Sequence, residues 1–155
     1  MSIRRAEEKD IEGIRKLLYQ VNQVHADGRP DLFKSGGIKY TEDELKEIIN
    51  DRTRPVYVYD EDEIILGYAF IWYEQTKEST STYAVKSMYI DDFCVDETAR
   101  GKSVGKQLFE FLKEEAKREA CDRITLHVCE CNPNAYGFYE HLGMKPLYTN
   151  MEYQI

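Results

Sequence analysis

The stretch from Tyr89 to Gly105 constrains the fold more than any other part of this sequence. An apolar segment ends at Val95, a short polar turn follows, and a basic loop with two glycines then opens an amphipathic segment. The apolar residues of that last segment recur at positions i, i+4, i+7 and i+8, which is typical of a half-buried helix. They are Val104, Leu108, Phe111, Leu112 and Ala116. The stretch therefore predicts a strand, a loop and a helix in direct succession.

The loop between this strand and this helix is suited to binding an anion. N–H groups in the first turn of a helix have no partner within the helix, so they can bind a phosphate. Gly101 and Gly105 allow the backbone to approach a ligand closely. Positive charge comes from Arg100, Lys102 and Lys106. We predict a pyrophosphate site here; the alternative is a solvated turn in which Ser103 caps the helix.

A P-loop is a poor interpretation of the same loop. Gly101-Lys102-Ser103 matches the end of that motif, but the motif also needs a glycine five positions before the Gly-Lys pair. Asp96 stands at that position, and its carboxylate would repel a phosphate. The sequence therefore argues against a P-loop nucleotide hydrolase.

Length and composition predict a single folded domain over residues 1–155. The chain is long enough for a sizeable core, and an apolar content of 42% with twelve Tyr and six Phe argues against disorder. The net charge of −8 and the lack of any Lys/Arg-rich block make nucleic acid a poor partner. An acidic surface suits a cationic substrate, although such a charge also serves solubility alone.

We expect a cytoplasmic protein with no membrane partner. The longest apolar run, 64–73, is about half the ~20 residues that a membrane-spanning helix needs. The basic pair near the start of the sequence is not followed by an apolar run, so it does not resemble a signal peptide.

The four cysteines do not predict a metal site or a redox motif. Their spacing is not that of a zinc site, and Cys129-Glu-Cys131 is not the C-x-x-C arrangement. Cys94 and Cys129 fall in apolar segments, where we expect small core residues of strands. We predict no metal.

Periodicity and turn residues predict an α+β fold, with a central mixed sheet and helices on both faces. Strands 83–95 and 122–129 flank the helix at 104–119, so they should be parallel neighbours. Ligands bind beyond the carboxyl ends of such strands, which brings the 96–105 loop to the cleft. The other expected elements are a strand at 3–6, helices near 9–27, 41–49 and 133–142, hairpin strands 54–59 and 64–73, and a last strand at 148–153.

Two motifs resemble those of the GNAT N-acetyltransferase superfamily. Residues 100–105, Arg-Gly-Lys-Ser-Val-Gly, resemble its R/Q-x-x-G-x-G/A loop. Residues 132–144 resemble its N-x-x-A-x-x-F/L-Y-x-x-x-G-F motif, with Asn132, Ala135 and Tyr139 at matching positions. The motifs occur in the family's order, and the element order over the whole chain suits the GNAT fold. The stretch 91–95, Asp-Asp-Phe-Cys-Val, also resembles diamine and polyamine acetyltransferases, which carry an acidic pair there.

The resemblance implies acetyl-CoA as donor and a primary amine as acceptor. It implies that a backbone N–H at the strand end binds the thioester carbonyl, and that the pantetheine amides run along the same edge. Tyr139 would donate a proton to the departing thiolate; the alternative is ordinary packing in its helix. The implied acetyl-CoA contacts are Phe93, Cys94, Val95, Arg100, Gly101, Lys102, Ser103, Val104, Gly105, Lys106, Asn132, Ala135 and Tyr139. Ser103 departs from the family's usual Gly, which costs room beside the pyrophosphate.

The acceptor side is less determined. Asp91 and Asp92 alternate along a strand, so only one should face the cleft unless a bulge intervenes. Either could bind an ammonium group or remove its proton through water; the alternative is a charge that faces solvent. The acceptor is then a small cationic amine such as a polyamine, or a protein lysine or N-terminus. A non-catalytic acyl-CoA-binding module remains the other class, and a homodimer is left open.

Overall fold

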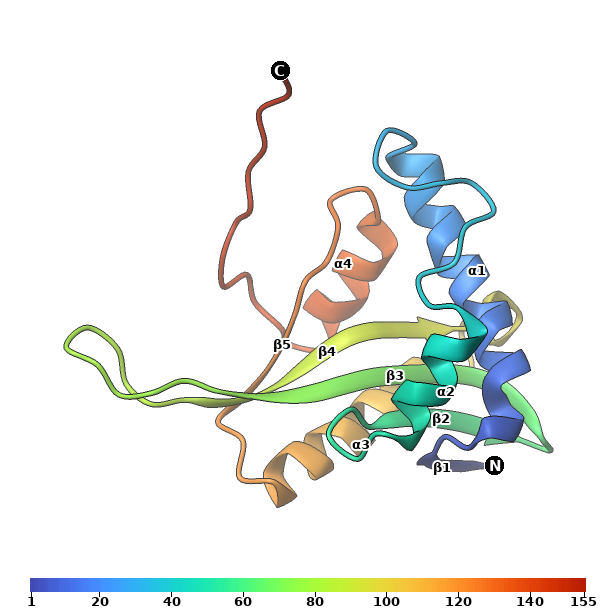
Figure 1. The fold of residues 1–155 in the computed structure, drawn as a ribbon, viewed down its shortest axis with the longest axis horizontal. Coiled ribbons are helices and arrows are strands. Elements are labelled where there is room, and N and C mark those ends of the chain that lie inside the picture. Colours follow the sequence, from blue (N-terminus) through green and yellow to red (C-terminus); the bar gives the residue numbers. More distant parts are fainter.

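The computed structural model describes residues 1–155 and places them in a five-stranded sheet with helices on both faces (Figure 1). The strands lie in the order β1-β2-β3-β4-β5. This confirms the predicted α+β fold with a mixed sheet. The strands are β1 (Ser2–Arg5), β2 (Val56–Glu61), β3 (Ile64–Gln75), β4 (Lys86–Val95) and β5 (Arg123–Leu126). The α-helices are α1 (Ile11–Gly28), α2 (Glu42–Asn50), α3 (Val104–Arg118) and α4 (Pro133–His141), with short 3-10 turns at Glu8–Asp10 and Glu97–Ala99.

Two core layers hold the helices to the sheet. Helices α1 and α2 bury Ile14, Leu17 and Leu45 against one face. Helix α3 buries Leu108 and Leu112 against the other face. The apolar period of the sequence therefore identifies the buried stripe of each helix. No helix is both long enough and apolar enough to cross a membrane.

The pairing of the strands agrees with the predicted topology. Strands β1 to β4 are antiparallel neighbours, and β5 runs parallel to β4. Helix α3 joins β4 to β5, which is the crossover expected of a β-α-β unit. The capping box predicted at 41–44 is also present at the start of α2.

A bulge interrupts β4 at its centre. Phe70 pairs with Asp92, but the next residue of β3, Ile71, pairs with Ile90, so Asp91 is left as an extra residue. An extra residue changes which face the following side chains take. Ile90 accordingly lies in the core under α3, while Cys94 lies in the core under α1.

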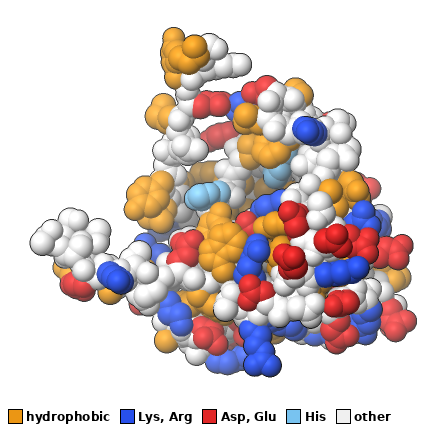
Figure 2. Space-filling model, in the orientation of Figure 1, with side chains coloured by type: hydrophobic (Ala, Val, Ile, Leu, Met, Phe, Trp, Pro, Cys, Tyr) orange, Lys and Arg blue, Asp and Glu red, His pale blue; other side chains and the backbone are white.

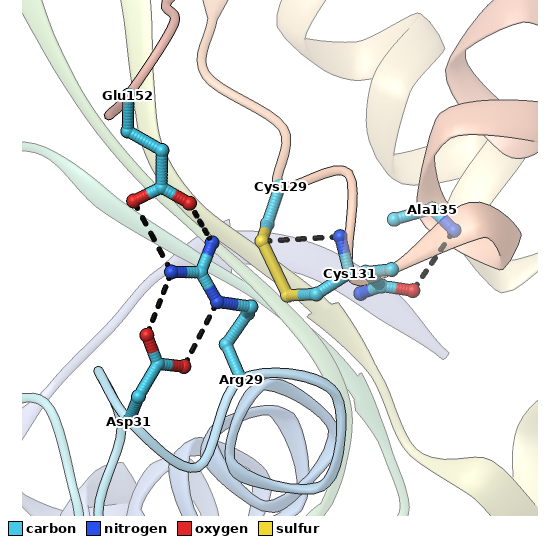
Figure 3. The surroundings of a disulfide bond; sticks show 7 residues. Arg29, Asp31, Cys129, Cys131, Ala135 and Glu152 are labelled. Carbon is cyan, nitrogen blue, oxygen red and sulfur yellow. Dashed lines mark hydrogen bonds and ion pairs between the residues drawn. A yellow bond between two sulfur atoms is a disulfide. The ribbon is translucent and has the colours of Figure 1, made fainter. Parts of the chain in front are cut away.

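Three expectations for the last third of the chain are wrong. Strand β5 ends at Leu126 instead of 129, and residues 142–155 contain neither helix nor strand, so the strand expected at 148–153 is not formed. Cys129 is not a core residue of a strand; it lies in the loop after β5 and forms a disulfide with Cys131 (Figure 3). The loop leaves the sheet at this point to reach α4, so pairing with β4 cannot continue.

Candidate active site

Strands β4 and β5 pair over only part of their length. Their register runs from Ser87 opposite Arg123 to Ile90 opposite Leu126 and stops there, while β4 continues to Val95. Residues 91–95 of β4 therefore have no strand beside them on the β5 side of the sheet. N–H and C=O groups on such an edge are available to an extended ligand.

Three elements meet at this opening. The ring of Phe93 on β4 lies 5.8 Å from that of Phe138 and 6.1 Å from that of Tyr139, both on α4. A Cβ on Gly105 of α3 would lie 2.9 Å from Cζ of Phe138 and 3.3 Å from Cγ2 of Val95. The end of β4, the start of α3 and α4 thus pack against one another at this opening. A Cβ on Gly105 would point into the contact with Phe138. The lack of a side chain therefore lets α3 lie close to α4.

The loop before α3 offers both charge and backbone donors. Gly101 and Ser103 have left-handed backbone angles, with φ of 80° and 62°. Ser103 stands at the N-cap position, yet its side chain makes no capping hydrogen bond, which removes the capping alternative. The first turn of α3 therefore keeps donors for an anion. The nearby cations are exposed and belong to no ion pair within the chain: Arg100, Lys102 and Lys106.

The hydroxyl of Tyr139 makes no hydrogen bond to the rest of the chain. Tyr40, Tyr57 and Tyr68 each bond to a carboxylate of this protein, whereas the Tyr139 hydroxyl has no such partner. Burial raises the pKa of Tyr139, and the nearby charge of Asp92 raises it further. The phenol therefore stays protonated at neutral pH and can donate a hydrogen bond.

The bulge brings both acids of β4 to one place. Nζ of Lys39 lies 3.0 Å from Oδ1 of Asp91 and 3.6 Å from Oδ2 of Asp92. Tyr40 donates to Asp91, and Tyr68 donates to Asp92 at 3.0 Å. Both carboxylates are nearly buried, with 10% and 11% of their side chains exposed. Burial raises the pKa of Asp92, which Lys39 and Tyr68 partly offset.

Comparison with known proteins decides the family. The model of the acetyltransferase (GNAT) family matches residues 19–144 of this chain. The chain belongs to the GNAT family. A solved structure of a mutant BH1408 protein from Bacillus halodurans is 33% identical over the full length of both chains, with a TM-score of 0.94.

Two curated N-acetyltransferases match more distantly. A thialysine N-epsilon-acetyltransferase of Bos taurus is 26% identical over 54% of this chain and 46% of its own length. A putative ribosomal protein bS18-alanine N-acetyltransferase of Bacillus subtilis is 28% identical over 64% and 60%. The chain thus spans about half the length of the curated relatives that it matches.

Several of the other predicted acetyl-CoA contacts have side chains that are engaged within the chain itself. The side chain of Cys94 is buried with its Sγ 3.6 Å from the carbonyl of Leu17, and Val104 is buried in the core. Asn132 accepts a hydrogen bond from the backbone N–H of Ala135 at 3.1 Å and so caps α4. Its amide NH₂ makes no hydrogen bond within the chain.

Sequence reasoning missed the basic and phenolic partners of the acid pair. Lys39 and Tyr40 stand directly before the capping box of α2, and Tyr68 lies on β3. Nothing local in the sequence links them to Asp91 and Asp92, because each contact crosses between separate elements. No group of three or more His, Cys, Asp or Glu side chains is arranged to bind a metal ion.

The last turn of α1 contacts the loop that follows it. His25 packs against Phe33 with ring centroids 5.0 Å apart. Burial lowers the pKa of His25, with Asp92 opposing and Lys39 supporting the shift. A pKa below its usual value leaves the imidazole neutral at pH 7.

Proposed function

We propose that residues 1–155 form a single domain that transfers an acetyl group from acetyl-CoA to a primary amine by direct attack. The observation that carries this proposal is the meeting of three features at one opening. They are the unpaired edge of β4 at 91–95, the basic loop at 100–106, and the unpartnered hydroxyl of Tyr139. The strand edge offers backbone hydrogen-bond donors, the basic loop offers positive charge, and the hydroxyl offers a proton for the leaving group.

The residues at the opening suit the parts of acetyl-CoA. Backbone N–H groups of Phe93 to Val95 suit the thioester carbonyl and the pantetheine amides, since they lie on a strand edge without a neighbour. The first turn of α3 and its exposed cations suit the pyrophosphate. Acetyl-CoA would supply an activated acyl group with a thiolate as leaving group. The chain's own part is to orient it and to manage the protons.

Tyr139 and the acid pair would manage those protons. Tyr139, kept protonated by burial, donates to the thiolate of CoA as it departs. Asp92 is suited to accept a proton from the amine through water, because burial raises its pKa and makes its carboxylate a stronger base. Asp91 lies beside it and interacts with the same positive charge.

We further propose a small cationic amine, of the polyamine type, as acceptor. The acid pair already attracts one ammonium group, that of Lys39, in this structure. A cationic acceptor would displace or share that contact. The thialysine acetyltransferase among the related proteins agrees with a small amine. The related ribosomal-protein alanine acetyltransferase makes a protein acceptor, at an N-terminus or a lysine, the second candidate class. An acyl-CoA-binding module without catalysis is the third, and Tyr139 argues against it.

An amine panel tests this proposal. CoA-thiol release would be followed with spermidine, diamines, aminoglycosides and peptides as acceptors. Tyr139→Phe should lower turnover by ~10²–10⁴-fold, because general acids contribute that much, with little change in acetyl-CoA affinity. Tyr136→Phe is the matched control, since that tyrosine is exposed on the same helix. Wild-type turnover in Tyr139→Phe, with chemistry rate-limiting, would leave Tyr139 as a packing residue.

A further inference from the structure

Asp92 differs from most carboxylates of this protein because it is buried. Over α1 and α2, Asp and Glu side chains lie on the surface among Lys and Arg side chains (Figure 2), as in the pairs that Glu42 forms with Arg15 and Lys46. The side chain of Asp92 is only 11% exposed. An ionised carboxylate is costly to bury unless hydrogen bonds and opposite charges satisfy it. The partners of Asp92 therefore decide how its carboxylate is held.

The two oxygen atoms of Asp92 have different partners. Oδ1 accepts a hydrogen bond from the hydroxyl of Tyr68 at 3.0 Å, whereas Oδ2 lies 3.6 Å from Nζ of Lys39. Lys39 is 39% exposed and has a flexible side chain, so a ligand can replace its contact. Tyr68 is fully buried and cannot move away in the same manner. The core therefore holds Oδ1, and Oδ2 is the oxygen left for an incoming amine or its water.

The sheet directs the hydroxyl of Tyr68 at this carboxylate. Phe70 of β3 pairs with Asp92 of β4, and Tyr68 lies two residues before Phe70 on the same face of β3. Tyr68 is therefore the diagonal neighbour of Asp92, at a distance that a long aromatic side chain can span. The ring of Tyr68 stands edge-on to that of Phe70, with the centroids 5.0 Å apart, in the core beneath α1. This packing fixes the ring and with it the hydroxyl.

Tyr68 donates to Asp92 as a neutral phenol. Burial raises the pKa of Tyr68 well above its usual value, and the charge of Asp92 raises it further, so the hydroxyl keeps its proton. Burial also raises the pKa of Asp92. Lys39, the hydrogen bond from Tyr68 and a protonated His25 oppose that shift, while the charge of Asp91 adds to it. The other titratable groups near Asp92 are uncharged at neutral pH: Tyr40, Cys94 and Tyr139.

We propose that Tyr68 is a positioning residue for acetyl transfer, whose buried hydroxyl holds Oδ1 of Asp92 and so leaves Oδ2 for the acceptor amine. The inference rests on the proposed function, in which Asp92 takes the proton of the amine. Tyr68 is fully buried, so it acts only through Asp92. Loss of its hydroxyl removes a donor from the ionised carboxylate, which raises the pKa of Asp92 and lets the carboxylate turn.

Tyr68→Phe tests this role, and Tyr57→Phe is the matched control. Tyr57 is also buried, and its hydroxyl bonds to Glu115 at 3.4 Å in the core on the opposite face of the sheet. The pKa of Asp92 would be measured by carbon NMR of its carboxyl group, with the signal assigned through Asp92→Asn. In Tyr68→Phe this pKa should rise by roughly 1–2 pH units, the size expected for one hydrogen bond to an ionised group. In Tyr57→Phe it should not change.

The pH profile of kcat/KM connects the change in pKa to catalysis. CoA-thiol release would be measured with the best acceptor of the amine panel from about pH 5 to 9, since the acid limb of such a profile reports the base of the free enzyme. That limb should move to higher pH in Tyr68→Phe and stay in place in Tyr57→Phe. A purely structural role would lower stability without moving it. Coenzyme A binding by calorimetry should be unchanged in both variants.

A measurement on the wild type covers the case in which Tyr68→Phe does not fold. The hydroxyl proton of Tyr68 should exchange slowly with water, and its NMR signal should shift as Asp92 titrates. Rapid exchange would overturn the inference, as would an unchanged pKa of Asp92 in Tyr68→Phe, even if the wild type acetylates amines well. A raised pKa with an unmoved acid limb would overturn the positioning role as well, because Asp92 would then not be the base. A wild type that acetylates no amine would instead refute the proposed function, and the catalytic role of Tyr68 with it.

Discussion

Lys39 stands where a cationic acceptor would place its ammonium group, so its removal tests the acceptor side of the proposed function. Its Nζ contacts Asp91 at 3.0 Å and Asp92 at 3.6 Å. In Lys39→Gln the acid pair loses the ammonium group that would compete with the proposed cationic acceptor. We predict that this variant has a lower KM for spermidine and an unchanged affinity for acetyl-CoA.

The expected change in KM depends on how far solvent screens the charge of Lys39. Two unit charges about 4 Å apart interact by roughly 4 kcal/mol at the effective dielectric constant near a protein surface. The Lys39 side chain is 39% exposed, so water screens most of that, and about 1 kcal/mol per contact remains. Two contacts give about 1–2 kcal/mol. This corresponds to a KM lower by roughly 5- to 30-fold, at about 1.4 kcal/mol per factor of ten.

The assay is CoA-thiol release with varied spermidine at low salt. Lys34→Gln is the matched control, because it makes the same charge change in the same loop at an exposed residue. Added salt should reduce the effect, since exposed charges are screened within about 8–10 Å. In an Asp92→Asn background the effect of Lys39→Gln should also shrink, because one of its two contacts is gone.

An unchanged or higher KM for spermidine in folded Lys39→Gln would refute the reasoning. The acid pair would then be a structural cluster with Lys39 and Tyr40, and the acceptor would bind elsewhere. A similar fall in KM in Lys34→Gln would instead assign the effect to the general field of the protein.

Three further changes test the fold around the site. Ser103→Gly should raise the unfolding free energy in urea by ~0.5–1 kcal/mol, because a φ of 62° strains a residue with a Cβ and the relief exceeds the added chain entropy; a less stable variant would contradict this. Gly105→Ala should cost about 1–3 kcal/mol and lower the Tm, since its Cβ would stand 2.9 Å from Phe138; an unchanged Tm would mean that the ring yields freely. Burial by itself would raise the pKa of Asp96, but hydrogen bonds, led by that of Lys16, lower it from 3.8 to about 2. The folded pKa is the lower one, so this stabilisation is present above about pH 4 and is lost as the pH falls toward 2. Asp96→Asn should remove that part of the pH dependence of urea unfolding, and an unaltered profile would assign it to other carboxylates.

Local pattern was enough for most of the fold. The period of apolar residues predicted α1, α3 and their buried stripes, and the capping box marked the start of α2. The strand, loop and helix at 89–105 occur as predicted, and β5 lies parallel to β4. These features depend on neighbours a few residues apart, so the sequence displays them directly. The segment at 148–153 was predicted as a strand on the same grounds, but a strand also needs a partner, which the chain does not provide.

The sequence by itself determined the chemistry that is available to the site. A basic loop at a helix start, an acidic pair on a strand and a tyrosine in a recognisable motif are all visible as residues in order. Only the tertiary structure decided how they meet. One extra residue in β4 turned both acids toward Lys39, and Gly105 lies against Phe138 across two helices. Alternation in the sequence shows that a strand has two faces. A bulge changes which face the following side chains take, and its position depends on the register with the neighbouring strand. That register is set by contacts between residues far apart in the chain.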